Sequence, residues 1–313
     1  MAQPVVSAAL FAATGLTPVT AESPNAERIE DLYWFVAFWA ALVLLAVAVP
    51  LTIFVVRYRS RGRDRTVEGP QIHGSTRLEV AWTLVPVVIL VIVTAFTFYK
   101  LPGITLEDEA SASDLRVRVE GRQFYWQYRY PNGVIAIDRL VAPQGRVVVL
   151  EITAPESDVN HSYWVPALGG KFDAIPGETV TTAFDANRVG IFEGQCAEFC
   201  GIQHAEMFAE IEVMPADEFD RWLDDQAEAQ SAGTSDLGEQ IFVGACSKCH
   251  GPEGQGLIGP PFTSANTADA ESVARVVRQG RGKMPAIGEE WDDQQMEALT
   301  DYLSERFGEE EQR

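Results

Sequence analysis

Residues 196–207 read Cys196-Ala-Glu198-Phe-Cys200-Gly-Ile-Gln-His204-Ala-Glu-Met207. Two thiolates, an imidazole and a thioether thus share one short segment, and these soft donors favour copper. Two cysteines four positions apart can both bridge a pair of metal ions. Each metal then needs one more imidazole and one weak donor. His161, upstream, is the second imidazole, and the weak donors are the Met207 sulfur and the Glu198 backbone carbonyl. The segment predicts a dinuclear copper centre in which shared thiolates delocalise an electron.

Three other sites compete with this interpretation. Cys196 and Cys200 would form a disulfide in an oxidising compartment. A zinc site would use methionine poorly, and a mononuclear blue-copper site needs only one cysteine. The four cysteines of the chain lie in two tight pairs, the second being Cys246 and Cys249. Cofactor ligation therefore explains them better than a long-range disulfide framework does.

The copper segment lies in a region of short β-type runs separated by Pro-Gly and Asn-Gly turns, about residues 114–213. The runs that alternate or are rich in β-branched and aromatic residues are Leu115–Val119, Phe124–Tyr130, Val147–Ile152, Thr179–Phe184 and Phe208–Val213. This pattern is typical of a β-sandwich or a Greek-key barrel.

Two apolar stretches precede this region, at about residues 32–56 and 78–99. Each is uncharged through its middle and long enough to cross a hydrocarbon core of roughly 30 Å. These two features favour membrane helices over helices buried in a protein core. The linker between them carries the arginines Arg57, Arg59, Arg61, Arg63, Arg65 and Arg77. By the positive-inside rule this linker is cytoplasmic, so both termini and everything from about Gly103 onward lie outside.

The N-terminal segment, residues 1–30, begins with an apolar run that is rich in small residues. Met1 to Ala21 resembles a signal peptide cleaved near Ala21, but no Lys or Arg precedes the apolar run. Both the cleaved and the uncleaved form stay open. The orientation of the two membrane helices is the same in either case.

Beyond the β-region, Ala216–Ala229 predicts a short charged helix, and residues 216–235 are expected to be a linker that ends in small residues. Residues 246–250 read Cys246-Ser-Lys-Cys249-His250. Cys-x-x-Cys-His is the attachment pattern of haem c, in which both thiols add to the haem vinyl groups and the histidine binds iron.

Met284 lies in the glycine-rich loop Gly280-Arg-Gly-Lys-Met284-Pro285 and is expected to be the sixth iron ligand. Ligation by histidine and methionine raises the reduction potential. An amphipathic helix over residues 292–307 closes the chain, with Met296, Leu299, Tyr302 and Leu303 on one face. Residues 236–313 are therefore predicted to form a cytochrome c domain.

Acidic residues outnumber basic ones, 45 to 24, which gives a formal net charge of -21. Such a surface argues against nucleic acid as a partner, because phosphate binding needs clustered Lys and Arg. It suits solubility or a basic partner. The acidic residues Glu289, Glu290, Asp292 and Asp293 either steer a basic electron donor or form a solvated face.

Further motifs carry a family resemblance. They are Leu78-Glu79-Val-Ala-Trp82, Gly121-Arg-Gln-Phe124-Tyr-Trp126, Asp158-Val-Asn-His161 and Val165-Pro-Ala-Leu-Gly-Gly-Lys171-Phe-Asp173. With the copper segment, they make residues 30–215 resemble subunit II of cytochrome c oxidase. Residues 236–313 resemble a small class I cytochrome c, and the combination resembles the caa3 type of haem–copper oxidase.

The resemblance implies a multidomain membrane protein with three parts. They are a two-helix transmembrane hairpin over residues 31–102, a cupredoxin-like Greek-key β-barrel over 103–215, and an all-α class I cytochrome c domain after the linker. The residues that it assigns to the mixed-valence CuA centre are His161, Cys196, Glu198 (through its carbonyl), Cys200, His204 and Met207. In this family the Glu198 carboxylate also binds magnesium at the boundary with subunit I.

The resemblance further implies an electron-entry subunit in a bacterial inner membrane. Electrons would pass from a donor, such as a cytochrome c or a quinol:cytochrome c reductase, to haem c, to CuA, and then to subunit I. Subunit I holds haem a and the haem–CuB centre, and couples oxygen reduction to proton pumping. Glu79 matches the mouth of a proton channel. Phe124 stands where many members have an electron-accepting Trp, and Tyr125 and Trp126 follow it.

Three alternatives remain open. A stand-alone membrane-anchored electron carrier would lack the oxidase partner that the Leu78–Pro86 motif suggests. Nitrous oxide reductase also carries a CuA loop, but it needs a large histidine-rich domain, and this chain has four histidines in all. The same shortage places oxygen reduction in another subunit. A quinol oxidase subunit II has typically lost the copper ligands.

Overall fold

A computed structural model describes residues 17–59, 62, 71, 73–104, 114–233 and 236–308. Two compact units are present, one made of Arg28–Gly103 and the other of the segment up to Glu27 together with Ile104 onward. Most of the predicted signal peptide and most of the arginine-rich linker lie outside the described residues.

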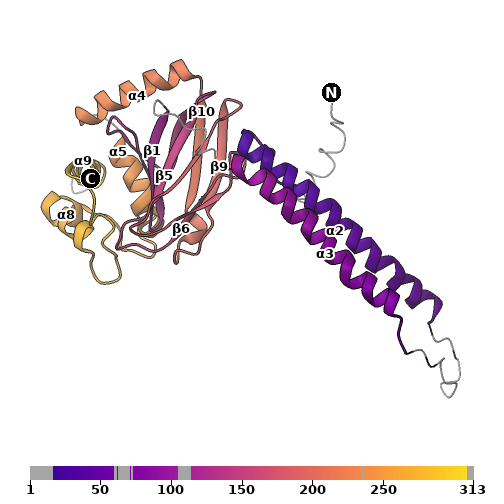
Figure 1. The fold of residues 1–313 in the computed structure, drawn as a ribbon. Helices are drawn as coiled ribbons and strands as arrows, with labels where there is room; N and C mark the ends of the chain where they lie inside the picture. Colours follow the sequence, from indigo (N-terminus) through magenta and orange to yellow (C-terminus); the bar gives the residue numbers. More distant parts are fainter. Residues whose placement is uncertain are drawn as a thin grey trace. The chain divides into compact units, whose positions relative to one another are not determined.

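The Arg28–Gly103 unit is a pair of antiparallel helices (Figure 1). Helix α2 spans Pro24–Arg57, helix α3 spans Thr76–Lys100, and the short 3-10 helix η1, Leu101–Gly103, follows. Lys100 Nζ lies 2.5 Å from Asp31 Oδ2, which joins the end of α3 to the start of α2. Both helices are long and apolar enough to cross a membrane, as the sequence predicted.

Helix α2 begins eight residues before the predicted membrane stretch. Ser23 Oγ accepts a hydrogen bond from the Ala26 N–H at 3.1 Å, and Pro24 follows as the first helical residue. A serine N-cap and a proline at the first position both favour a helix start. Capping therefore extends the helix beyond the apolar run that predicted it.

The copper segment belongs to a sandwich of two five-stranded sheets. The first sheet has the order β3 (Ile135–Ile137), β2 (Tyr125–Arg129), β1 (Leu115–Arg122), β5 (Val148–Thr153) and β8 (Val180–Phe184). The second has the order β4 (Arg139–Pro143), β10 (Phe208–Met214), β9 (Gly190–Cys196), β6 (His161–Trp164) and β7 (Lys171–Ala174). Side chains buried between the sheets include Trp126, Leu140, Ile152 and Ile211.

The predicted β-sandwich is confirmed, and each of the five predicted runs coincides with a strand. Strands β3, β4, β6, β7 and β9 were not predicted. Strands β3, β6 and β7 have only three or four residues, too few for alternation to stand out.

Helix α4, Ala216–Ser231, replaces most of the expected linker. Phe219 is buried in the sandwich core. Gln230 closes the edge of strand β3, because its Oε1 accepts from the Ile135 N–H at 3.0 Å and its Nε2 donates to the Ile135 carbonyl at 2.7 Å. The predicted charged helix is therefore present, and it packs on the β-sandwich rather than lying free.

The cytochrome domain is helical. Its elements are α5 (Leu237–Ile241), the π-turn η4 (Phe242–Cys246), α6 (Ser247–His250), α7 (Ser264–Thr267), α8 (Ala270–Gln279) and α9 (Asp293–Phe307). Helix α9 confirms the predicted closing helix. Met296, Leu299 and Leu303 are buried on its inner face, and Asp292 caps it by accepting from the Gln295 N–H at 3.0 Å.

The β-sandwich and the cytochrome domain share a hydrophobic core. Tyr125 and Ile137 of the first sheet lie in one buried cluster with Leu237, Trp291 and Leu299. The Trp291 indole N–H donates to the Tyr125 hydroxyl at 2.8 Å. The two domains therefore pack directly against each other through apolar surface.

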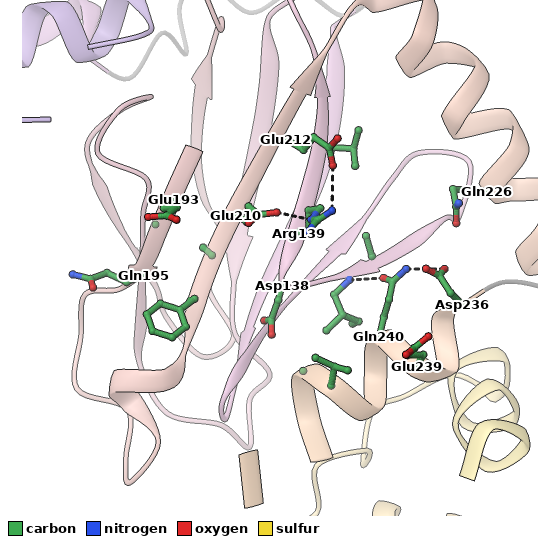
Figure 2. A pocket seen from close by; sticks show the side chains of 18 of the residues that line it. Asp138, Arg139, Glu193, Gln195, Glu210, Glu212, Gln226, Asp236, Glu239 and Gln240 are labelled. Carbon is green, nitrogen blue, oxygen red and sulfur yellow. Dashed lines mark hydrogen bonds and ion pairs between the residues drawn. The ribbon is translucent and has the colours of Figure 1, made fainter. Parts of the chain in front are cut away.

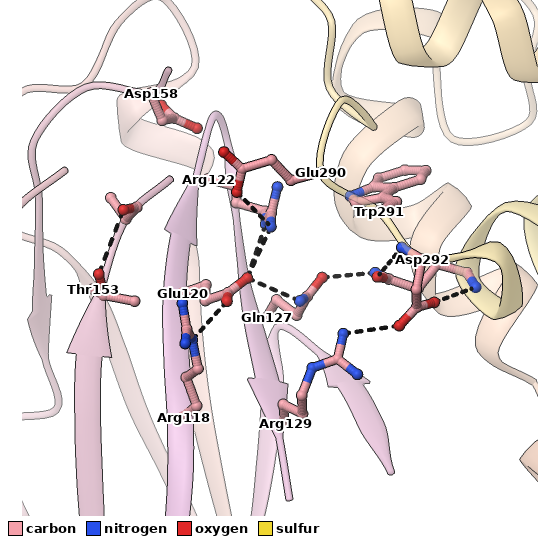
Figure 3. A network of polar contacts seen from close by, with 12 residues as sticks. Arg118, Glu120, Arg122, Gln127, Arg129, Thr153, Asp158, Glu290, Trp291 and Asp292 are labelled. Atoms are coloured by element: carbon pink, nitrogen blue, oxygen red, sulfur yellow. Dashed lines mark hydrogen bonds and ion pairs between the residues drawn. The ribbon is translucent and has the colours of Figure 1, made fainter. Parts of the chain in front are cut away.

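A polar network continues this interface (Figure 3). Buried Gln127 accepts from the Gln295 side-chain amide at 2.7 Å and donates to the Glu120 carboxylate at 3.0 Å. Arg129 donates to Asp292 at 3.0 Å. Hydrogen bonds to buried polar groups lower the cost of burying them, so the network stabilises one packing of the two domains.

Candidate copper and haem centres

Six predicted copper ligands converge at one end of the sandwich. Cys196 Sγ lies 3.9 Å from both His161 Nδ1 and Cys200 Sγ. Cys200 Sγ lies 3.6 Å from His204 Nδ1 and 3.8 Å from Met207 Sδ. The Glu198 carbonyl is 3.2 Å from Cys196 Sγ. The structure thus brings together two sulfurs, each with its own imidazole and its own weak donor.

Two strands and a short helical turn hold these groups. His161 opens β6, Cys196 ends β9, and His204 begins the turn η3. The Cys196 N–H donates to the Met207 carbonyl at 2.9 Å, which closes the loop between β9 and β10. This loop, residues 196–207, is called the copper loop below. Five ligands therefore come from one hydrogen-bonded loop, and His161 reaches them from the neighbouring strand.

The two sulfurs are 3.9 Å apart, so they do not form a disulfide. Their hydrogen bond lowers the pKa of Cys196 to about 3 and raises that of Cys200, because one proton serves both. Soft thiolates, imidazoles and a thioether suit two copper ions, whereas methionine is a poor zinc ligand. The donor set therefore fits the dicopper centre.

Residues behind His161 fix its ring. Burial lowers the pKa of His161, but hydrogen bonds, first that from Asp158, outweigh burial and raise it overall. Asp158 Oδ1 lies 3.2 Å from His161 Nε2, which leaves Nδ1 facing the sulfurs. On the other side, a Cβ at Gly121 would lie 2.9 Å from the His161 side chain. Only glycine fits there without a shift of strand or ring.

We expect Asp158→Asn to weaken copper binding by about 10–100-fold, because a carboxylate behind a ligating imidazole orients the ring and raises its basicity. Competition with a copper chelator measures the change. Asp173→Asn is the matched control, since Asp173 accepts from the Ser162 hydroxyl at 2.7 Å and touches no predicted ligand. Equal affinities for both variants would contradict the role of Asp158.

The predicted haem residues lie on consecutive helical turns. Cys246 ends η4, and Cys249 and His250 lie on α6, so the two thiols are one turn apart. The loop after Gly251 folds back over them, since Ile258 and Gly259 both donate to the Cys249 carbonyl at 2.9 and 2.8 Å. This compact haem-attachment turn, residues 246–250, presents the side chains of Cys246, Cys249 and His250 together.

His250 Nδ1 lies 2.7 Å from the Pro260 carbonyl, which leaves Nε2 for iron. A Cβ at Gly259 would approach the His250 ring to 2.7 Å, so glycine is required there too. Met284 ends a tight turn in which Arg281 and Met284 exchange backbone hydrogen bonds of 3.0 and 3.1 Å. The residues fit covalent haem with histidine and methionine ligands.

The side chains of the other predicted site residues differ in their surroundings. Tyr125 and Trp126 are fully buried, and Phe124 is half-buried. The Glu198 side chain is exposed. Glu79 lies in the first turn of α3, and its Oε1 accepts from the Ser75 N–H at 3.3 Å. Capping the helix is therefore one structural role of Glu79.

A pocket of about 1060 Å³ opens beside β4, β9, β10 and α5. Figure 2 shows Arg139 between Glu210 and Glu212, with Asp236 and Glu239 nearby. Arg139 pairs with Glu210 at 2.5 Å and Glu212 at 3.4 Å. Among the described residues, those that line this pocket include no predicted copper or haem ligand.

Sequence comparison matches three family models along the chain. Residues 12–100 match the transmembrane domain of cytochrome c oxidase subunit II, and residues 134–214 match its periplasmic domain. Residues 233–303 match the model described as cytochrome c oxidase, cbb3-type, subunit III. The first two matches cover the helical pair and the copper ligands, and the third covers the haem motif.

Individual relatives agree. Cytochrome c oxidase subunit 2 of Alkalihalophilus pseudofirmus is 33% identical and covers 92% of this chain and 90% of its own length. That of Cereibacter sphaeroides is 32% identical over 67% of this chain and 79% of its own. The crystal structure of the periplasmic domain of oxidase subunit II from Bradyrhizobium japonicum is 32% identical over 38% of this chain and 96% of its own, with a TM-score of 0.36.

The alignment with the first relative spans 92% of this chain at 33% identity. The periplasmic-domain match places the copper domain on the outer side of a membrane. The chain therefore belongs to the cytochrome c oxidase subunit II family and carries a fused cytochrome c domain.

Proposed function

We propose that electrons enter this chain at its cytochrome domain and leave it from the copper loop, as in the caa3 type of oxidase. When bound, haem c and the two copper ions supply the redox couples. Cys246, Cys249, His250 and Met284 hold the haem. The copper ligands are His161, Cys196, Glu198 (carbonyl), Cys200, His204 and Met207.

The packing of the two domains carries this proposal. Gln203, in the copper loop, donates to the carbonyl of Lys248, between the two haem cysteines, at 2.9 Å. Phe124 stands at the position of the family's electron-accepting Trp. Lys248 contacts it too, because the Lys248 ammonium donates to the Phe124 carbonyl at 2.6 Å. The Tyr125 ring lies in the core shared with the chain's own cytochrome, and the Trp126 ring lies against His161 inside the sandwich, which suits entry from haem c rather than from a soluble donor.

Three of the four acidic residues predicted either to steer a donor or to form a solvated face have a basic partner inside the chain, and one of them is Asp293, which lies 3.1 Å from Arg278. Glu290 lies 3.9 Å from Arg122, and Asp292 pairs with Arg129. The donor itself, a cytochrome c or a quinol:cytochrome c reductase, would meet other parts of the cytochrome domain.

The wider assembly forms the second part of the proposal. The chain joins subunit I, which holds haem a and the haem–CuB centre, in a bacterial inner membrane. The exposed Glu198 carboxylate would bind magnesium at that boundary. Subunit I then reduces oxygen and pumps protons.

Rapid mixing of the oxidised full-length protein with a reduced cytochrome c tests the order of entry. We expect the haem absorbance to change first and the copper absorbance to follow at a rate independent of donor concentration. A variant with both Cys246 and Cys249 replaced by alanine should then accept electrons at copper far more slowly. Copper reduction at an unchanged rate in that variant would refute the proposed order.

Glu79 is proposed to begin proton uptake into subunit I. In the oxidase complex, Glu79→Gln should slow proton uptake, because an amide cannot carry the proton, whereas Glu79→Asp should retain most of it. Proton release and uptake by reconstituted vesicles measure this. If Gln and Asp slow uptake equally, Glu79 serves only as a helix cap.

A further inference from the structure

Lys248 is unusual among the charged residues of the cytochrome domain. It lies between the two haem cysteines, and its side chain is only 15% exposed. Its ammonium donates to the Phe124 carbonyl at 2.6 Å and to Asp138 Oδ2 at 3.2 Å. A buried ammonium is costly without such partners, and both partners belong to the β-sandwich.

Both partners of Lys248 connect directly to the copper centre. The residue before Phe124, Gln123, donates its side-chain amide to the Cys200 carbonyl at 2.5 Å. Its backbone N–H donates to Asp158, the partner of His161, at 3.0 Å. Displacing the Phe124 backbone would therefore disturb the groups that hold two copper ligands.

Asp138 provides the second connection. Its Oδ1 accepts from the Trp126 N–H at 2.8 Å, and the Trp126 ring meets the His161 ring edge-on at 5.9 Å between centroids. Asp138 is held in the left-handed region at φ 59°. Lys248 lowers the pKa of this carboxyl, although burial, the larger effect, leaves it raised overall. The pair forms an interdomain ion pair at the connection between β3 and β4.

The main chain of Lys248 adds a third contact. Its carbonyl accepts from Gln203 Nε2 at 2.9 Å, and Gln203 precedes the copper ligand His204. Lys248 therefore bonds the haem-attachment turn to the copper loop through Gln203 and to Phe124, the residue just before strand β2. The shared core and the network of Figure 3 hold the domains elsewhere along the interface.

We propose that Lys248 is a positioning residue that fixes the haem-attachment turn against the copper loop. This inference rests on the proposed function, in which one electron passes from reduced haem iron to the oxidised copper pair with no bond formed or broken. The transfer depends steeply on the separation of the two centres. A residue that bonds both loops at once sets that separation.

The test uses the full-length chain loaded with copper and haem and the variant Lys248→Gln, which loses the charge but keeps a polar side chain. Losing a charge-assisted hydrogen bond shifts an equilibrium by about tenfold or more. We expect the amides of Trp126 and Gly251 to exchange about tenfold faster and haem-to-copper transfer after a laser-triggered reduction to slow. The haem spectrum and the copper content should stay unchanged, because no ligand is replaced.

Lys248→Arg should restore both readouts, since a guanidinium also donates to a carbonyl and a carboxylate. Lys171→Gln is the matched control, because it removes the same charge from an exposed position on strand β7. Unchanged exchange and transfer in Lys248→Gln would overturn the inference while leaving the haem-first order intact. Loss of the haem-first order in the unaltered protein would instead refute the proposed function.

Discussion

Replacement of Cys200 by serine is expected to abolish the delocalised two-copper EPR signal of this protein. Cys200 Sγ lies within 4 Å of Cys196 Sγ, His204 Nδ1 and Met207 Sδ, so it contacts the donors of both metals. A hydroxyl is a hard, poorly ionised donor that cannot replace a bridging thiolate. We expect copper content to fall from about two ions per chain to one or none, measured by metal analysis beside EPR.

Cys249→Ser is the reciprocal control for this experiment. It removes one thiol of the haem motif and should alter haem attachment, seen as a shifted optical band, without changing the copper signal. The haem spectrum of Cys200→Ser should likewise match that of the unaltered protein. A delocalised signal that survives in Cys200→Ser would show that Cys200 does not bridge, and the dicopper assignment would fail.

The second large effect is expected for Met284→Leu. Loss of a thioether ligand removes the stabilisation of ferrous haem that methionine supplies. Axial ligands tune haem potentials over several tenths of a volt, so we expect a fall on the order of 0.1 V, measured by redox titration. At equilibrium a smaller fraction of the haem and a larger fraction of the copper centre would then be reduced.

Met296→Leu is the matched control, because Met296 is buried in the cytochrome core on α9. A Met-to-Leu exchange that conserves volume costs less than about 1.5 kcal/mol in a core, so this variant should fold and keep its potential. If Met284→Leu and Met296→Leu have the same potential, Met284 is a packing residue and another group completes the iron site.

The strands show how far the sequence pattern predicts this fold. Runs such as Phe208–Val213 alternate over six residues, and they coincide with strands because every second side chain enters the core. Strand β6, His161–Trp164, has four residues and no visible alternation. It forms because its neighbours β7 and β9 supply hydrogen bonds, and β9 lies more than 20 residues further along the chain.

The interface between the domains could not be predicted from the sequence, because its contacts join residues far apart along the chain. Tyr125 was predicted as an electron-entry aromatic, yet its ring lies in a core shared with Trp291. Asp292 was predicted either to steer a donor or to be solvated, yet it caps α9 and pairs with Arg129. Neither partner can be inferred from spacing, because each lies more than 150 residues away along the chain.

The sequence by itself determined the two cofactor motifs, Cys196–Met207 and Cys246–His250, since the residues of each motif lie within a turn or a single loop and local geometry brings them together. It also determined the two membrane helices, because length and apolar composition alone satisfy the bilayer. Only the tertiary structure showed that the predicted ligand His161 lies 3.9 Å from Cys196 Sγ and that Lys248 bonds the copper side. Those contacts join segments far apart in the chain, and the folding of the sandwich and the packing of the cytochrome on it create them.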